Sequence, residues 1–61
     1  MIEILIVEDE KPISDLIRLN LMKAGYSCTC AFDGMEAADI LEERNFDLII
    51  LDVMPVSYTH L

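Results

Sequence analysis

Basic residues are scarce in this 61-residue sequence, which has 4 Lys and Arg against 12 Asp and Glu and a formal net charge of -8. A protein that binds nucleic acid through its own surface normally carries a basic patch or stripe. The composition therefore argues against nucleic acid as a partner of this chain. Cations are the small partners that such an acidic chain favours.

A long apolar run is also missing, although 54% of the residues are hydrophobic and the mean hydropathy is +0.41. No segment approaches the ~20 apolar residues of a membrane span, and the N-terminus lacks the basic stretch and long apolar run of a signal peptide. We therefore expect a cytoplasmic protein with no membrane segment. At this length one domain is the maximum, and its high apolar content suggests a fragment with strands covered on both faces.

Cysteine, histidine and glycine are too few for several common sites. Cys28 and Cys30 are two residues apart, which in a strand puts both on one face without disulfide geometry, so we interpret them as small buried hydrophobes. A zinc site would need two more ligands, and His60 is the only histidine. Nucleotide-binding folds are disfavoured because neither a G-x-G-x-x-G nor a Gly-Lys-Ser/Thr phosphate loop is present.

Apolar patterning predicts a strand followed by a helix in the first half of the chain. Residues 2–7 (IEILIV) are nearly all aliphatic, as expected of a strand buried on both faces. Pro12 suits the first turn of a helix, and Gly25 suits its left-handed end. The helix between them carries one apolar stripe, formed by Ile13, Leu16, Ile17, Leu21 and Ala24.

The second half of the chain repeats this order and adds a third strand. Residues 27–32 alternate between two faces, which favours an edge strand. Asp33 is placed to cap a helix, with Glu36 three residues later in a near capping box, and this helix should run to about Arg44. Residues 48–51 (LIIL) then predict a doubly covered strand whose carboxyl end is Asp52.

The predicted order strand, helix, strand, helix, strand indicates an α/β fold. Right-handed βαβ crossovers make the sheet parallel and place all strand ends on one rim. If the first and third strands are neighbours, the order is 2-1-3, an incomplete doubly wound sheet of the flavodoxin-like type. Ligands of such sheets bind beyond the carboxyl ends of the strands.

Acidic residues fall on that rim from two distant segments, Glu8 and Asp9 after the first strand and Asp52 after the third. Gathered carboxylates repel one another unless a cation joins them, and an open, all-oxygen site favours Mg²⁺, or Mn²⁺, with several waters retained. Such an ion also makes phosphoryl transfer to a carboxylate plausible. Alternatively, the first pair only favours the following helix dipole and Asp52 only caps a strand.

With these residues identified, the sequence resembles the N-terminal half of a response-regulator receiver domain, the phosphoacceptor module of two-component signalling. The similar stretches are ILIVEDEKPISDLIRLNLMKAGY, AFDGMEAADIL and FDLIILDVMP, which together cover nearly all of residues 2–55. The resemblance implies a phosphoacceptor that is not a turnover enzyme. Its partner would be a sensor histidine kinase or a phosphotransfer protein, and the parent protein a regulator of transcription.

The resemblance assigns a role to each rim residue. Asp52 corresponds to the aspartate that accepts the phosphoryl group, and Asp9 to the direct Mg²⁺ ligand. Glu8 corresponds to the other acidic residue that helps to hold the metal. Met54 would offer its backbone carbonyl to the ion, and Pro55 corresponds to the proline that stiffens the next loop.

The similarity ends after Pro55, so we divide the chain into residues 1–55, the receiver half, and residues 56–61, an atypical tail. The Ser or Thr and the Lys that the family uses at the ends of later strands have no counterpart here, which predicts an impaired fragment. An alternative is a receiver-like binding module that is never phosphorylated. An aspartate-nucleophile hydrolase is disfavoured, because Met54 stands where those enzymes have a second aspartate.

Overall fold

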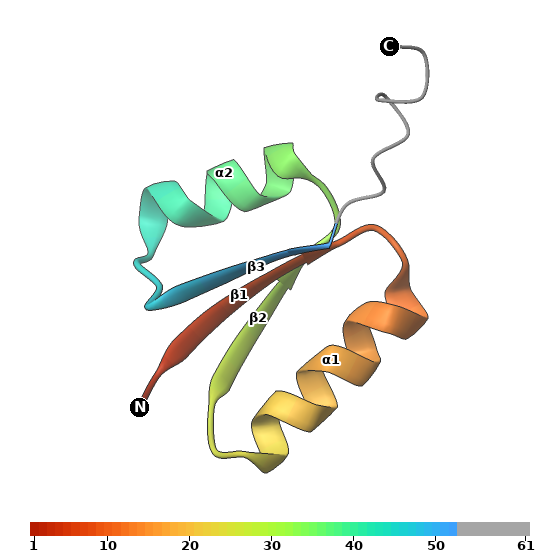
Figure 1. Cartoon of the computed structure of the whole chain (residues 1–61). Helices are drawn as coiled ribbons and strands as arrows, with labels where there is room; N and C mark the ends of the chain where they lie inside the picture. The colour runs from red at the N-terminus through yellow and green to blue at the C-terminus, as the bar shows by residue number, and fades with distance from the viewer. Residues whose placement is uncertain (53–61) are drawn as a thin grey trace, which may run out of the picture.

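The computed structural model of the chain describes residues 1–52, with the backbone alone at Asp52. Five elements follow one another along the chain (Figure 1). They are β1 (Glu3–Glu8), α1 (Lys11–Lys23), β2 (Ser27–Ala31), α2 (Gly34–Glu43) and β3 (Leu48–Asp52). The predicted order is confirmed, with bounds that differ by about one residue from the expected ones. Met54, Pro55 and residues 56–61 lie outside the described residues.

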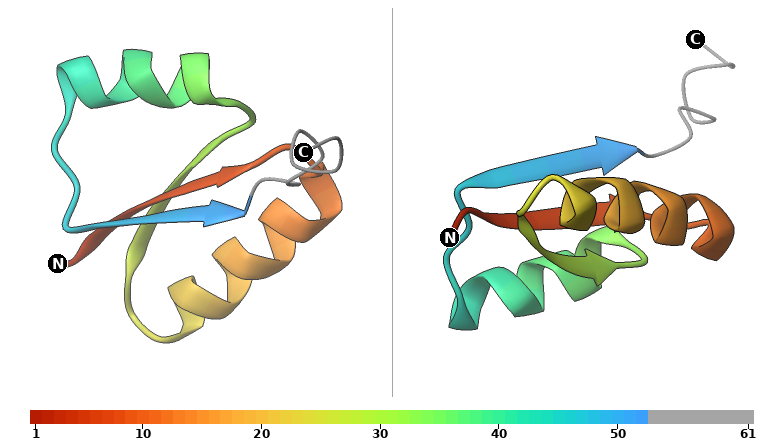
Figure 2. Two further views of the ribbon diagram at one scale, coloured as in Figure 1. Left: turned by 45° about the horizontal axis from the view of Figure 1, so that its top comes forward. Right: turned by 90° about the horizontal axis from the view of Figure 1, so that it is seen from below.

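The three strands form one parallel sheet in the order β2-β1-β3, as predicted. The helices α1 and α2 lie on opposite sides of this sheet (Figures 1 and 2), which is the doubly wound arrangement. The crossovers from β1 to β2 and from β2 to β3 have the same hand but run in opposite directions along the sheet, so their helices lie on opposite faces. Neither described helix is both long and apolar enough to cross a membrane.

The core is built around β1, the central strand. Leu5 and Val7 are at most 2% exposed and pack against Ala31 and Ala37, with Ile40 and Phe46 beside them. Ile4 and Ile6, which alternate with them along the strand, are equally buried on the α1 side. The unbroken apolar run of β1 is therefore explained by a helix on each face and a strand on each side.

The prediction that β3 is covered on both faces is wrong for the described chain. Leu48, Ile49 and Leu51 are 52%, 42% and 69% exposed. The reason is that both helices pack on β1 and β2, and no described Cα of either helix lies within 8 Å of one in β3. An aliphatic run shows that a strand needs covering, but it does not show which segment provides the cover.

Two further expectations about burial need correction. Within the predicted α1 stripe, Ile17 and Leu21 are half-buried, whereas Ile13 and Leu16 are exposed because β3 carries no helix beside them. Ser14 is the residue of α1 that is buried, at 1% exposed. The predicted stripe was therefore centred on the wrong flank of the helix.

Cys28 and Cys30 are half-buried in β2 rather than fully buried, and both thiols are free. An edge strand leaves part of each side chain open to solvent. Burial raises the pKa of the Cys28 thiol, and the neighbouring Cys30 adds to this effect. At neutral pH Cys28 therefore behaves as an uncharged, weakly polar side chain, in keeping with the interpretation as a small hydrophobe.

Local capping fixes where the helices begin and end. Asp33 caps α2, because its Oδ1 accepts a hydrogen bond from the Glu36 N–H at 2.8 Å. Glu36 reaches back as predicted, but its Oε1 accepts from the Phe32 N–H at 2.7 Å, one residue before the N-cap of a standard capping box. Gly25 follows α1 with φ of 98°, the left-handed conformation that favours glycine.

Arg44 joins the amino ends of the strands, opposite the acidic rim. Its guanidinium donates to Thr29 Oγ1 and to Glu3 Oε1, each at 3.2 Å, and lies 5.0 Å from the centre of the Phe46 ring. Nearby, the Asp47 N–H donates to the Glu3 carbonyl, and Asp47 Oδ2 accepts from the Glu3 N–H. These contacts hold β3 in register with β1 at the end away from the candidate site.

Asp33→Ala should lower the free energy of unfolding by about 1 kcal/mol, because the Glu36 N–H loses its cap. Urea unfolding followed by circular dichroism measures the change. Asp39→Ala, an exposed position inside the same helix, is the matched control and should change stability little. Equal losses in both variants would show that the cap has no special role.

Candidate functional site

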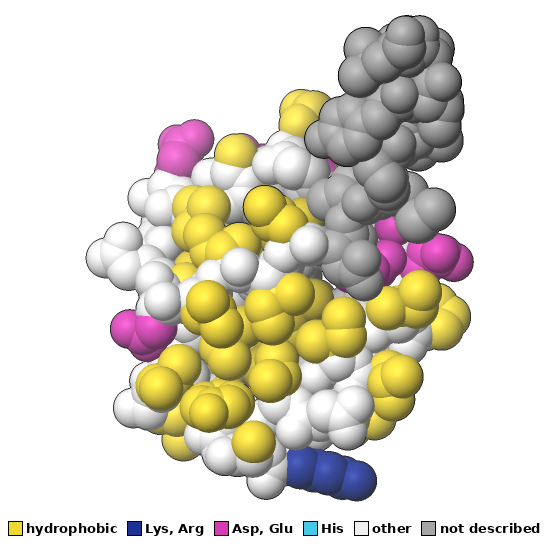
Figure 3. Space-filling view, in the orientation of Figure 1, with side chains coloured by type: hydrophobic (Ala, Val, Ile, Leu, Met, Phe, Trp, Pro, Cys, Tyr) yellow, Lys and Arg dark blue, Asp and Glu magenta, His cyan; other side chains and the backbone are white. Residues whose placement is uncertain are grey.

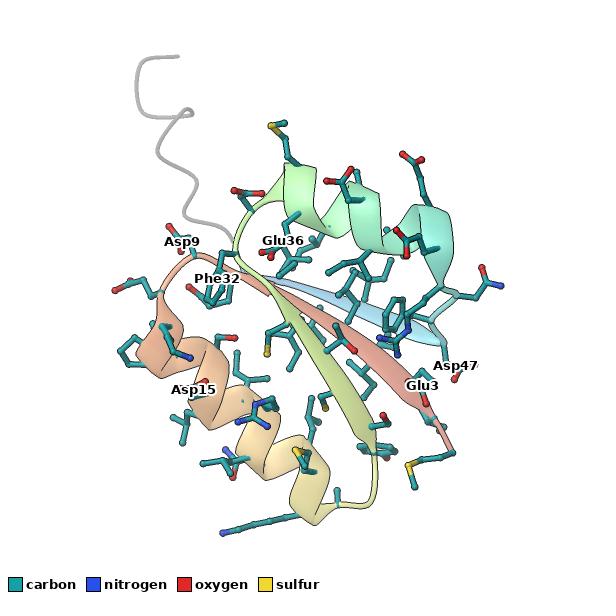
Figure 4. The ribbon with its side chains drawn as sticks, turned by 180° about the vertical axis from the view of Figure 1, so that it is seen from behind. Glu3, Asp9, Asp15, Phe32, Glu36 and Asp47 are labelled. Atoms are coloured by element: carbon teal, nitrogen blue, oxygen red, sulfur yellow. The ribbon has the colours of Figure 1, made fainter. Side chains whose placement is uncertain are left out.

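The carboxyl ends of β1 and β3 lie side by side at one end of the sheet. Glu8 is the last residue of β1, and its register partner in β3 is Asp52, the last residue of that strand. Asp9 follows Glu8 directly, at the same end of the sheet. Figure 4 labels Asp9 at this end and Asp47 at the opposite one. Two acidic segments 44 residues apart in sequence therefore meet at one rim, as the topology predicts.

Glu8 is held in a fixed position within this rim. Its side chain is only 3% exposed, and its Oε2 accepts a hydrogen bond from the Glu10 N–H at 2.8 Å. A buried carboxylate that accepts a backbone N–H is oriented as well as partly neutralised. The bond also folds the chain back over β1 directly before α1 begins, so Glu8 fixes the loop that carries Asp9.

Asp9 differs from Glu8 because its side chain is exposed to solvent. It follows the last residue of the strand and precedes Glu10, the N-cap of α1. The acidic pair thus consists of one buried, oriented carboxylate and one that is open to solvent. This division suits a hydrated cation, which can meet an exposed oxygen directly and a less accessible one through water.

The side chains described at the rim do not form a complete metal site by themselves. Among residues 1–52, apart from the side chain of Asp52, no group of three or more His, Cys, Asp and Glu is placed to hold an ion. The donor set fits Mg²⁺ in kind, because Glu8 and Asp9 offer only oxygen. The ligand roles of Glu8, Asp9 and Asp52 remain predictions, and the Met54 carbonyl lies outside the described residues.

Two features of the rim escaped the sequence analysis. The first is the main-chain N–H of Glu10 as the donor to Glu8; such a bond to the residue two positions on is usual for Asp and Asn, so a Glu gives no clear signal of it in the sequence. The second is the contact of Lys11 with Phe32, whose ring centre lies 6.0 Å from Lys11 Nζ. Lys11 also pairs with Asp15 at 3.4 Å, and both side chains are exposed, so Lys11 is a solvated surface charge.

Two cavities of the described residues lie away from the rim. One of about 370 Å³ adjoins the second half of α1 and the start of β2, and another of about 180 Å³ lies between α2 and β2. Neither includes Glu8 or Asp9. At the rim itself the Asp9 carboxylate is exposed to solvent, which suits a small hydrated ion and a phosphoryl group better than an enclosed organic ligand. The first cavity is lined by Met1, Arg18, Met22, Gly25, Tyr26, Ser27 and Cys28.

Comparison with known families agrees with this geometry. Residues 4–56 match the response regulator receiver domain family. The chain belongs to this family. The parallel β2-β1-β3 sheet with its two helices is accordingly part of a flavodoxin-like fold. Receiver domains are generally phosphoacceptors in two-component signalling and not turnover enzymes, which supports a phosphoacceptor role.

The Glu10 amide hydrogen should exchange slowly with solvent, because a buried carboxylate accepts it. Glu8→Ala should accelerate this exchange by about tenfold or more, as expected from losing a hydrogen bond to a charged group. Hydrogen exchange followed by nuclear magnetic resonance gives the rate. Glu10→Ala keeps the main-chain donor and should leave it protected; rapid exchange in that variant would contradict the proposed contact.

Proposed function

We propose that this chain is the phosphoacceptor half of a response-regulator receiver domain and that Asp52 accepts the phosphoryl group. The observation that carries this proposal is the register pairing of Asp52 with Glu8, next to the exposed Asp9, at the carboxyl ends of two neighbouring parallel strands. Ligands of open parallel sheets bind at this position. The family match supports the same role.

The reaction is a transfer from the phosphohistidine of a sensor histidine kinase or phosphotransfer protein. A carboxylate oxygen of Asp52 attacks phosphorus, the P–N bond breaks, and the electron pair remains on the imidazole nitrogen, which then takes up a proton. Glu8 and Asp9, with the Met54 carbonyl, would hold Mg²⁺ beside Asp52. The bound ion supplies positive charge that offsets the charge of the phosphoryl oxygens.

Glu8 and Asp9 have different tasks in this proposal. Asp9 is exposed and is the direct ligand, whereas Glu8 is buried, keeps the β1–α1 loop in place through the Glu10 N–H and helps to hold the ion through water. Without a cation, the acids at the rim repel a phosphodonor. Phosphorylation should therefore depend on Mg²⁺ or Mn²⁺.

The receiver half that we propose comprises residues 1–55, with residues 56–61 as a tail outside the family pattern. Ser57 and Thr59, which lie in this tail, match no family position. The parent protein would be a cytoplasmic regulator of transcription, in which a separate domain binds DNA.

Asp9→Asn and Asp52→Asn should each weaken Mg²⁺ binding by about tenfold or more, because each removes a charged oxygen ligand. Isothermal titration of the folded variants measures the affinity. Asp47→Asn is the matched control, since Asp47 lies at the opposite end of the sheet and should have no effect. Equal affinity in all four proteins would reject a shared metal site.

Incubation with Mg²⁺ and a small phosphodonor should produce an acid-stable, base-labile adduct on Asp52, detected by mass spectrometry. The adduct should vanish in Asp52→Asn and on chelation of the metal, but not in Asp47→Asn. A folded chain that forms no adduct, and whose partner binding ignores both Mg²⁺ and Asp52→Asn, would instead be the unphosphorylated binding module.

A further inference from the structure

A cavity of about 370 Å³ lies between the second half of α1 and the start of β2, and we call it the α1–β2 cavity. Its walls come from α1, from the turn that follows and from the start of β2, through Arg18, Met22, Gly25, Tyr26, Ser27 and Cys28. Ser27 is the register partner of Glu3 at the amino end of β1, whereas the acidic rim lies at the carboxyl end. The cavity is therefore separate from the candidate phosphoacceptor site.

The cavity lies beside β2, the strand that is farthest from β3 in the sheet. The strand order is β2-β1-β3, and a flavodoxin-like sheet continues it as 2-1-3-4-5, so later strands of such a sheet join beyond β3. Cys28 pairs in register with Ile4 and lines the cavity together with residues of α1, which places the cavity on the α1 face of β2. Strands that follow β3 in this fold therefore do not fill it.

The backbone that forms the cavity is held by hydrogen bonds. At the end of α1, the Gly25 N–H donates to the Met22 carbonyl at 3.0 Å. The Tyr26 N–H donates to the Leu21 carbonyl at 3.1 Å, which completes a Schellman motif. The first N–H of β2 donates to the Ile2 carbonyl at 2.9 Å and ties this wall to the start of β1. The walls are therefore formed before a ligand arrives, which lowers the entropic cost of binding one.

Most of the lining is apolar, and its charged member is a cation. Apolar atoms come from Met1, Met22, Tyr26 and Cys28. The Cys28 thiol stays uncharged at neutral pH, because burial raises its pKa. None of the described residues that line the cavity is Asp or Glu, so the Arg18 guanidinium has no carboxylate beside it there. The cavity thus combines an apolar surface with one positive charge.

Arg18 pairs with no acid among the described residues. The ion pairs there are formed by Lys11 and Arg44, although the sequence has 12 acidic residues against 4 basic ones. The Arg18 guanidinium donates instead to Met22 Sδ at 3.4 Å, and a thioether sulfur is a weak acceptor. A guanidinium has five N–H donors in a planar fork that matches a carboxylate. Arg18 therefore retains donors for an anion in the cavity.

We propose that the α1–β2 cavity binds a small organic carboxylate with an aromatic body. Arg18 takes the carboxylate, and Met22 and Tyr26 contact the rings. This role goes beyond the phosphoacceptor function and does not depend on it. The volume lies near the lower end of the roughly 300–1,000 Å³ of small-molecule sites, which suits a compact ligand of one or two rings. A phosphate ester fits less well, because it brings about two negative charges to a single guanidinium.

The position of the cavity reduces the repulsion between an anion and this acidic chain. On the face drawn in Figure 3, Asp and Glu side chains show along the upper and left margins and beside the grey atoms, whereas basic side chains show at the lower margin, where α1 ends. The rim lies about the length of β1 away, roughly 20 Å for six residues, and the Debye length at physiological salt is only about 8 Å. Glu3 lies at the near end of the sheet, but Arg44 pairs with it.

Titration of the isotope-labelled chain with 2-naphthoate, followed by nuclear magnetic resonance, tests the proposal. We expect saturable shifts of the amides of residues 25–28, with one ligand per chain. The neutral 2-naphthamide has the same rings and should bind about tenfold more weakly or worse, because it cannot form the charge-assisted bonds to Arg18. Acetate has the charge without the rings and should cause no saturable shift in the same concentration range.

Arg18→Gln should raise the dissociation constant of 2-naphthoate by about tenfold or more, because the carboxylate loses its charged donor. Lys23→Gln is the matched control, since it removes an equal charge from the last turn of α1 at a residue that does not line the cavity, and it should change the constant by less than about twofold. The comparison of the acid with the amide on the wild type keeps the test decisive if Arg18→Gln fails to fold. Equal binding of acid and amide, equal losses in the two variants, shifts confined to the acidic rim, or no saturable binding would each overturn the proposal.

Discussion

The parallel pairing of β1 with β3 is the constraint on which the rest of the structure depends. It matches Glu8 with Asp52 at the carboxyl ends and Ile4 with Leu48 near the amino ends, so one register sets both the acidic rim and the core. A slip of one residue would turn the apolar set of β3 to the opposite faces and move Asp52 away from Glu8. At the amino end, the contacts of Asp47 with Glu3 oppose such a slip.

The rim is held together against its own charge by backbone geometry. Glu8 is almost completely buried, a position that costs free energy for a carboxylate unless a donor compensates it. The Glu10 N–H supplies part of that compensation, and it belongs to the residue at which α1 is capped. The start of the helix and the orientation of the buried acid are therefore one structural feature. Asp9, between them, is left exposed and available to a cation.

Much of this arrangement follows from the sequence because local and topological rules agree. Gly25 follows the end of α1 and Asp33 caps the start of α2, as expected, and the right-handed crossovers leave few possible strand orders. Burial could not be predicted in the same way. The apolar run 48–51 predicts a strand that is buried on both faces. The exposure of Leu51 depends instead on which other segments pack against β3, and the local pattern does not contain that information. The contacts of Arg44 with β1 and β2 likewise are long-range contacts that no local pattern contains.

The acidic carboxyl end of β3 and its exposed outer edge have separate physical origins and lie at different places on the strand. Its carboxyl end contributes an acid whose neighbours Glu8 and Asp9 come from β1 and the loop that follows it, so the character of the rim is set on the inner edge of the strand. Within residues 1–52 its outer edge pairs with no strand and carries exposed Leu and Ile side chains. The register that places the acidic residues is therefore fixed on the inner edge, through the pairing of β3 with β1.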